Sequence, residues 1–136
     1  MPERAYVDAN VILRFLLGDP PDMAARARAL FERMERGEIT LIVDTVVIAE
    51  CVWTLRSFYK IAISDIATTM RDFLLLPNLE VPERAVLLEA LVTYERNGVD
   101  FVDALSAARM HAAEEEYVYS FDRHFDRLPS VRRVQP

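Results

Sequence analysis

Four acidic residues stand where their neighbours are apolar or where a strand is expected to end: Asp8, Glu50, Asp103 and Asp122. Clustered carboxylates repel one another, so a group of this kind persists where a cation neutralises it. Oxygen ligands favour Mg²⁺ or Mn²⁺ over zinc. One or two such ions can polarise a phosphoryl oxygen and lower the pKa of a bound water. The residue types therefore predict metal-dependent hydrolysis of phosphodiester bonds.

Asp8 and Asp122 are each expected directly after a strand. An apolar stretch over residues 5–17 indicates a buried strand that runs into a helix, and a second strand is expected at residues 117–120. Ligands of parallel α/β sheets bind at the carboxyl ends of the strands, so both acids are expected at that edge. Each also has a structural explanation, because Asp8 or Asn10 can cap the helix and Asp122 can form a turn.

Glu50 and Asp103 are expected on helices. Glu50 is the only charge between Asp44 and Arg56, and burying an ionised carboxylate is costly unless it is paired or bound to a metal. Its apolar neighbours make Glu50 the candidate general base. A surface position or an ion pair with an arginine are the alternatives. Asp103 lies in the first turn of a helix that Asp100, three residues earlier, is expected to cap.

The elements that must position these acids alternate between strand and helix. Besides the first strand and helix, strands are expected at residues 40–43, 79–81, 117–120 and 131–134, and helices at 20–36, 44–58, 64–76, 82–97 and 103–116. Ser64 is the expected N-cap of the third of these helices, and Gly98 follows the fourth as a C-cap. This order predicts one α/β domain over residues 1–136, with a mostly parallel central sheet and helices on both faces.

Composition restricts the class of protein. The 136 residues are 52% hydrophobic and 28% charged, which is typical of a globular domain. No apolar run is long enough to cross a membrane and no signal peptide is recognised, so a cytoplasmic protein is expected. One cysteine, with His111 and His124, cannot build a Cys/His zinc site. The net charge of −6 argues weakly against a broad nucleic-acid surface. The argument is weak because a bound metal ion would neutralise four of the carboxylates.

Four segments resemble the acidic motifs of PIN-domain proteins: YVDANV at residues 6–11, Ala49-Glu50, FVDAL at residues 101–105 and SFD at residues 120–122. Over its full length the chain resembles the small VapC-type toxins of toxin–antitoxin pairs. The resemblance implies a Rossmann-like α/β/α sandwich and a Mg²⁺- or Mn²⁺-dependent endoribonuclease. It also implies inhibition by a cognate antitoxin and a homodimer.

Carried over residue by residue, the resemblance implies an acidic site with polar supports at Asn10, Thr45 and Ser120. We expect Asp8 and Asp103 to bind the metal directly, and Glu50 and Asp122 to bind a second ion or water on the first. Whether Asp100 or Asp126 joins the site stays open.

Basic residues adjoin the acidic motifs. Arg123, His124 and Arg127 follow Asp122 and are candidates for contacts with RNA phosphates, with a solvated loop as the alternative. Arg14 and Arg109 lie on helices next to motif residues and are expected either to bind RNA in the same way or to pair with the acids.

Three other functions stay open. A receiver domain of a phosphorelay has a similar length, but needs a lysine near the last strand, and Lys60 is the only lysine. A metal-independent ribonuclease would use His111 and His124. A PIN fold could also act without catalysis, by sequestering a partner. The apolar residues 46–55, with Trp53 among them, favour a dimer interface or an antitoxin groove, or are ordinary core.

Overall fold

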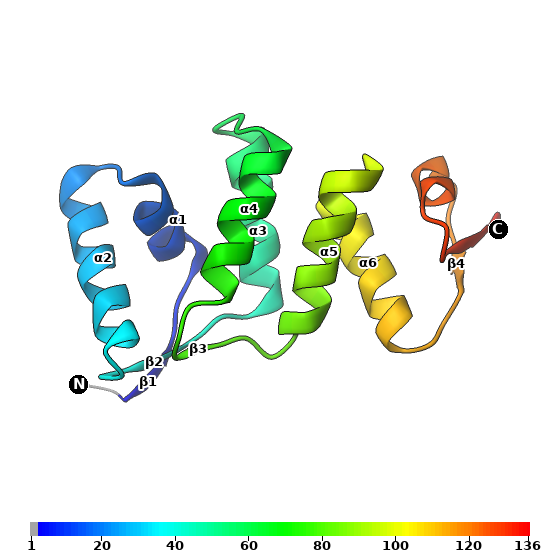
Figure 1. Ribbon diagram of the computed structural model, residues 1–136. Helices are drawn as coiled ribbons and strands as arrows, with labels where there is room; N and C mark the ends of the chain where they lie inside the picture. Colours follow the sequence, from blue (N-terminus) through cyan, green and yellow to red (C-terminus); the bar gives the residue numbers. More distant parts are fainter. Residues whose placement is uncertain (1–2) are drawn as a thin grey trace.

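Five strands of the computed structural model, which describes residues 3–136, are divided between two parallel sheets (Figure 1). The first sheet has the order β1-β2-β3, with β1 at Arg4–Tyr6, β2 at Thr40–Ile42 and β3 at Leu79–Glu80. The second pairs β4 (Tyr117–Tyr119) with β5 (Arg132–Val134). Ala5 lies opposite Leu41, and Val118 lies opposite Arg133.

Six α-helices and one 3-10 helix connect the strands. Their bounds are α1 Ala9–Leu17, α2 Pro21–Glu35, α3 Thr45–Ser57, α4 Ile63–Leu74, α5 Arg84–Asn97, α6 Phe101–Ala112 and η1 Arg123–Arg127. Because neighbouring parallel strands need a crossover connection, a helical segment lies between each pair. In Figure 1, α5 and α6 stand between the first sheet and β4.

The core joins the first sheet to the helices. Phe31 of α2 contacts Phe15 and Phe73, with ring centroids 4.4 and 5.6 Å away, so α1, α2 and α4 share one aromatic cluster. Leu41 of the central strand is fully buried beside it. Helix α6, whose buried residues include Ala104, packs mainly on α5.

Most helix ends follow the sequence signals. Asp8 and Asp44 are the N-caps of α1 and α3, and Gly98 ends α5 in the left-handed region with a φ of 64°. The expected Ser64 cap is wrong: α4 begins at Ile63, whose side chain packs against the core.

Helix α6 was expected over residues 103–116, and the structure places it at Phe101–Ala112. Its earlier end has an electrostatic reason, because the three glutamates at 114–116 follow directly and negative charge is unfavourable at a helix C-terminus. Glu114 leaves the helix with a φ of 59°.

The predicted α/β class with parallel strands is confirmed, but the strands do not join in one sheet. In residues 3–136, β1 and β4 are each paired on one side only. Tyr6 on β1 and Tyr117 and Tyr119 on β4 have exposed side chains. No helix in the described part of the chain is both long and apolar enough to cross a membrane.

Candidate metal centre

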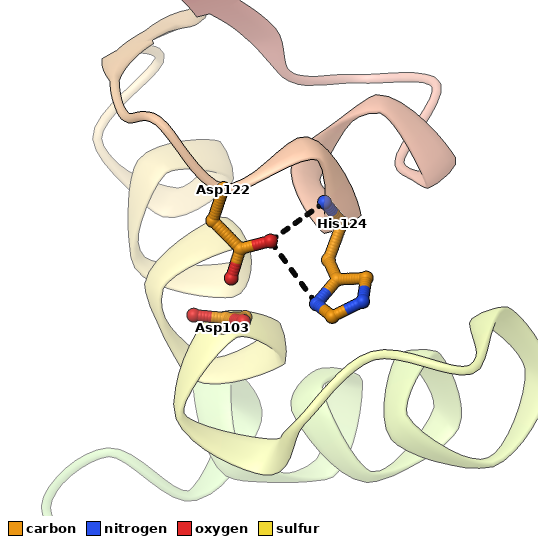
Figure 2. A group of neighbouring side chains, drawn as sticks. All are labelled: Asp103, Asp122 and His124. Carbon is orange, nitrogen blue, oxygen red and sulfur yellow. Dashed lines mark hydrogen bonds and ion pairs between the residues drawn. The ribbon is translucent and has the colours of Figure 1, made fainter.

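Asp103, Asp122 and His124 lie together and each offers one possible metal ligand, with all three atoms within 4.8 Å of one another. Asp103 comes from the first turn of α6, Asp122 from the residues after β4 and His124 from η1. Figure 2 shows the two carboxylates and the imidazole ring facing a common space. The group joins segments that are about 20 residues apart in the chain.

The local chain holds the Asp122 carboxylate in place. Asp122 is the N-cap of η1, and its Oδ1 accepts a hydrogen bond from the backbone N–H of His124 at 2.8 Å. The same oxygen lies 3.0 Å from Nδ1 of the His124 ring (Figure 2). The backbone N–H of Asp122 in turn donates to Oγ of Ser120 at 2.9 Å. Ser120 therefore supports the Asp122 segment through the backbone rather than through the carboxylate.

Negative charge accumulates at this centre. Burial raises the pKa of Asp103, and the carboxylates of Asp122 and Asp100 raise it further, while His124 partly offsets them. An ionised carboxylate in this position gains from a neighbouring cation. Two carboxylates and one imidazole are a donor set that fits a divalent metal ion.

Asp8 and Glu50 lie outside the group formed by Asp103, Asp122 and His124. Asp8 is exposed, and its Oδ1 accepts from the backbone N–H of Val11 at 3.1 Å, which is the helix-capping role. Both Asp8 and Glu50 act on the buried thiol of Cys51: burial, then the charge of Glu50, then that of Asp8 raise the pKa of Cys51 to about 12. Of the four predicted acids, the structure therefore groups Asp103 with Asp122, whereas Asp8 and Glu50 both lie near the Cys51 thiol.

Glu50 lacks the burial expected of a general base. Its side chain is exposed. Its apolar neighbours on α3 are exposed as well, Val46 by 68% and Trp53 by 67%. The burial on which the base assignment depended is absent around Glu50 in the described structure.

Thr45, expected to support the acidic site, is bonded to a different acid. It is buried, and its hydroxyl donates to Oε1 of Glu83 at 2.7 Å. Arg109 also donates to Glu83, at 3.0 and 2.7 Å, so its partner is an acid outside the four predicted for the site. The hydrogen bond from Arg109, then that from Thr45, lower the pKa of Glu83 to about 2.

The sequence profile of the PIN domain matches residues 5–131. The chain belongs to the PIN domain family. PIN domains are generally nucleases and typically use divalent metal ions, which agrees with the donor set of the centre. A search of curated proteins found no match.

The other candidate residues of this PIN domain have separate partners. Asp126 forms an ion pair with Arg133 at 3.0 Å, which lowers the pKa of Asp126. Arg127 donates to the carbonyl of Gly98 at 2.6 Å. Arg123 is exposed, which fits both a contact with RNA and a solvated loop.

Three further candidates from the sequence belong to α1 and to the start of α6. Asn10 is exposed in the first turn of α1. Asp100 is the N-cap of α6, but its side chain makes no capping hydrogen bond. Arg14 donates to the carbonyl of Asp19 at 2.7 Å and to the hydroxyl of Tyr59 at 2.9 Å, so it pairs with neither Asp8 nor Glu50.

His124 was assigned from the sequence to RNA phosphates, and its place among the possible metal ligands was missed. The sequence did contain a signal for this position. An N-cap aspartate accepts a hydrogen bond from the backbone N–H two residues later, which brings His124 next to the Asp122 carboxylate. His111 is elsewhere: its Nδ1 lies 2.7 Å from Glu89 on α5. The two histidines therefore do not form the catalytic pair that a metal-independent ribonuclease would need.

Proposed function

We propose that this PIN domain is a metal-dependent endoribonuclease of the VapC type, the toxin of a cytoplasmic toxin–antitoxin pair. The observation that carries the proposal is the group of Asp103, Asp122 and His124, whose ligand atoms lie within 4.8 Å of one another. The family supplies the nuclease class, and the order of the acidic motifs supports the toxin type. Metal dependence follows from the donor set.

In this proposal Asp103, Asp122 and His124 hold Mg²⁺ or Mn²⁺. A bound ion of this kind polarises a phosphoryl oxygen and lowers the pKa of a water molecule. The chain's contribution is to orient the ligands: the hydrogen bonds at 2.8 and 2.9 Å hold Asp122 in position before any ligand arrives. In the same proposal Asp8 and Glu50, which both lie near the Cys51 thiol, bind a second ion or its water.

The proposed partners are an RNA substrate, a cognate antitoxin and a second copy of the chain. Arg123 is exposed directly beside Asp122, where a guanidinium can contact RNA phosphates. Val46 and Phe58 at the two ends of α3 are exposed by 68% and 73%, which supports a protein interface on this helix.

The test is cleavage of a mixed RNA pool by the purified chain in Mg²⁺ or Mn²⁺, beside an EDTA control. Asp122→Asn removes one proposed ligand charge, and Asp22→Asn on α2, where the carboxylate is 87% exposed, is the matched control for the same chemical change. We expect cleavage by the wild type and by Asp22→Asn, and loss of cleavage in EDTA and in Asp122→Asn. Cleavage that survives EDTA would overturn the metal mechanism, and a folded chain that binds the metal but cleaves no RNA would favour the non-catalytic module.

A further inference from the structure

A cleft of about 410 Å³ lies between α3 and α6, beside the metal centre. Its lining includes Asp103 from the centre and Trp53 from α3, so the two sites are continuous. The volume is within the range of about 300–1,000 Å³ that is usual for small-molecule sites. We propose that this cleft binds one unpaired base of single-stranded RNA, stacked on Trp53. The inference rests on the proposed ribonuclease function and names the form of RNA that it accepts.

Trp53 is the side chain that gives the cleft its binding surface. The indole is 67% exposed, although the two residues before it on α3, Cys51 and Val52, are buried. Across the cleft, Val102 on α6 is 61% exposed. An exposed aromatic face beside an aliphatic side chain suits a flat base, because a base stacks on an aromatic ring whatever its identity. Bases in a duplex are already stacked and cannot enter, so the cleft selects single strands.

Two packed aromatic rings form part of the lining of the cleft. Tyr94 and Phe101 line it, and both are buried. Their rings pack edge to face, with centroids 5.8 Å apart and an angle of 89° between the planes. A preformed lining limits the side-chain ordering that ligand binding would otherwise require.

Two charged side chains in the cleft can orient the base and its backbone. Asp100 makes no capping hydrogen bond with its side chain, so its oxygens are placed to accept from the amino group of a base. Arg56 makes one hydrogen bond, to the carbonyl of Ile61 at 3.2 Å, and its guanidinium has further N–H groups for a phosphate. We therefore expect bases that carry an amino group to bind more tightly than uracil.

The mixture of charges argues against a second protein chain as the occupant. The cores of protein interfaces are depleted in charged residues, whereas Asp100, Asp103 and Arg56 all line this cleft. Nucleotide sites combine an aromatic surface with a few polar groups in this way. A base held here places its own phosphates next to Asp103, so Trp53 is a specificity-determining residue for the bond that is cut.

Trp53 is the only tryptophan in the chain, so the intrinsic tryptophan fluorescence of the protein comes from this residue alone. The experiment titrates the full chain, in EDTA so that RNA is not cleaved, with short oligoribonucleotides, either single-stranded or annealed as duplexes. Intrinsic fluorescence reports stacking, and the anisotropy of an end-labelled oligonucleotide reports affinity. We expect single strands to quench the fluorescence and duplexes not to. Trp53→Ala should weaken single-strand affinity roughly 5- to 100-fold, which corresponds to one stacked base.

Two variants separate stacking from general damage. Trp53→Phe keeps an aromatic face and should retain most of the affinity. Tyr117→Ala removes another exposed aromatic side chain, on β4 and outside the lining of the cleft, and should leave affinity unchanged. Single-strand binding without quenching, or equal affinity in Trp53→Ala, would overturn the inference. So would a dimer that Trp53→Ala dissociates without loss of RNA affinity, because the face would then be an interface between copies.

The outcome is distinct from that of the ribonuclease test. Metal-dependent cleavage without quenching of Trp53 would remove the base site and leave the nuclease in place. Quenching by single strands without any cleavage would support the base site and remove the nuclease.

Discussion

Asp122 uses one carboxylate oxygen for two contacts with His124: it accepts the backbone N–H at 2.8 Å and lies 3.0 Å from the ring nitrogen Nδ1. The contact to the backbone requires only the start of η1, so the carboxylate is oriented by its own segment. The contact to the ring brings a third donor to the space in front of Asp103 (Figure 2). This relationship makes the role of His124 testable.

His124→Ala should weaken Mn²⁺ binding by about 10-fold or more, because removing a ligand or its orienting partner typically costs 10- to 100-fold in metal affinity. Calorimetric titration with Mn²⁺ measures the effect. The control is His111→Ala, whose imidazole is paired with Glu89 outside the centre. Equal affinity in the two variants would contradict the assignment of His124.

Asp103→Asn should raise the thermal stability of the metal-free protein at neutral pH. Burial and the charges of Asp122 and Asp100 raise the pKa of Asp103 in the folded state, so its ionised form is disfavoured by folding. The resulting loss of stability grows as the pH rises through that pKa, and an amide avoids it. Melting curves in EDTA at pH 7 check the direction, and the same variant should lose the stabilisation that Mn²⁺ gives the wild type. A lower melting temperature in EDTA would show that the carboxylate contributes stabilising contacts.

Glu83 should make the fold sensitive to acid. Its pKa is lowered from 4.5 to about 2 by the hydrogen bonds from Arg109 and Thr45. The stabilisation is complete above about pH 4.5 and is lost as the pH falls through about 2. Urea unfolding at a series of pH values should show a steeper loss of stability in this window for wild type than for Glu83→Gln. Parallel pH profiles for the two proteins would contradict this role.

Thr45→Val should destabilise the fold by about 1 kcal/mol, the usual contribution of one buried hydrogen bond. The substitution keeps the shape of the side chain and leaves Glu83 paired with Arg109, whose guanidinium is 2.7 Å away. Thr45→Ser, which keeps the hydroxyl, is the matched control. If both variants lose metal-dependent activity without loss of stability, Thr45 belongs to the active site as the sequence resemblance implied.

Residues next to one another in the chain could be predicted well from the sequence. Asp8 and Asp44 were recognised before helices, and Gly98 was recognised after one, because caps depend on local backbone geometry. Contacts across the fold were harder. Thr45 was assigned to the acidic site, yet its partner is Glu83, 38 positions away, and nothing in the spacing of the two residues indicates the pair.

The grouping of the acids could be predicted only in part. Asp103 and Asp122 are brought together as expected. Asp8 and Asp122 both follow parallel strands, which predicts a shared edge if all strands belong to one sheet. The strands β1 and β4 belong to different sheets, so the two acids are not carried on one edge. Which strands pair depends on contacts between distant parts of the chain, and helical periodicity does not specify these contacts.

The sheet of β4 and β5 has two strands of three residues each, and two strands alone are marginally stable in water. It leads into the segment that carries Ser120, Asp122 and His124, whereas Asp103 belongs to the helical part of the molecule. Local opening of the C-terminal segment would thus remove two of the three ligands at once. A cation bound by both parts would link them. Binding of the cation would then oppose opening of the C-terminal segment, and opening of that segment would release the cation.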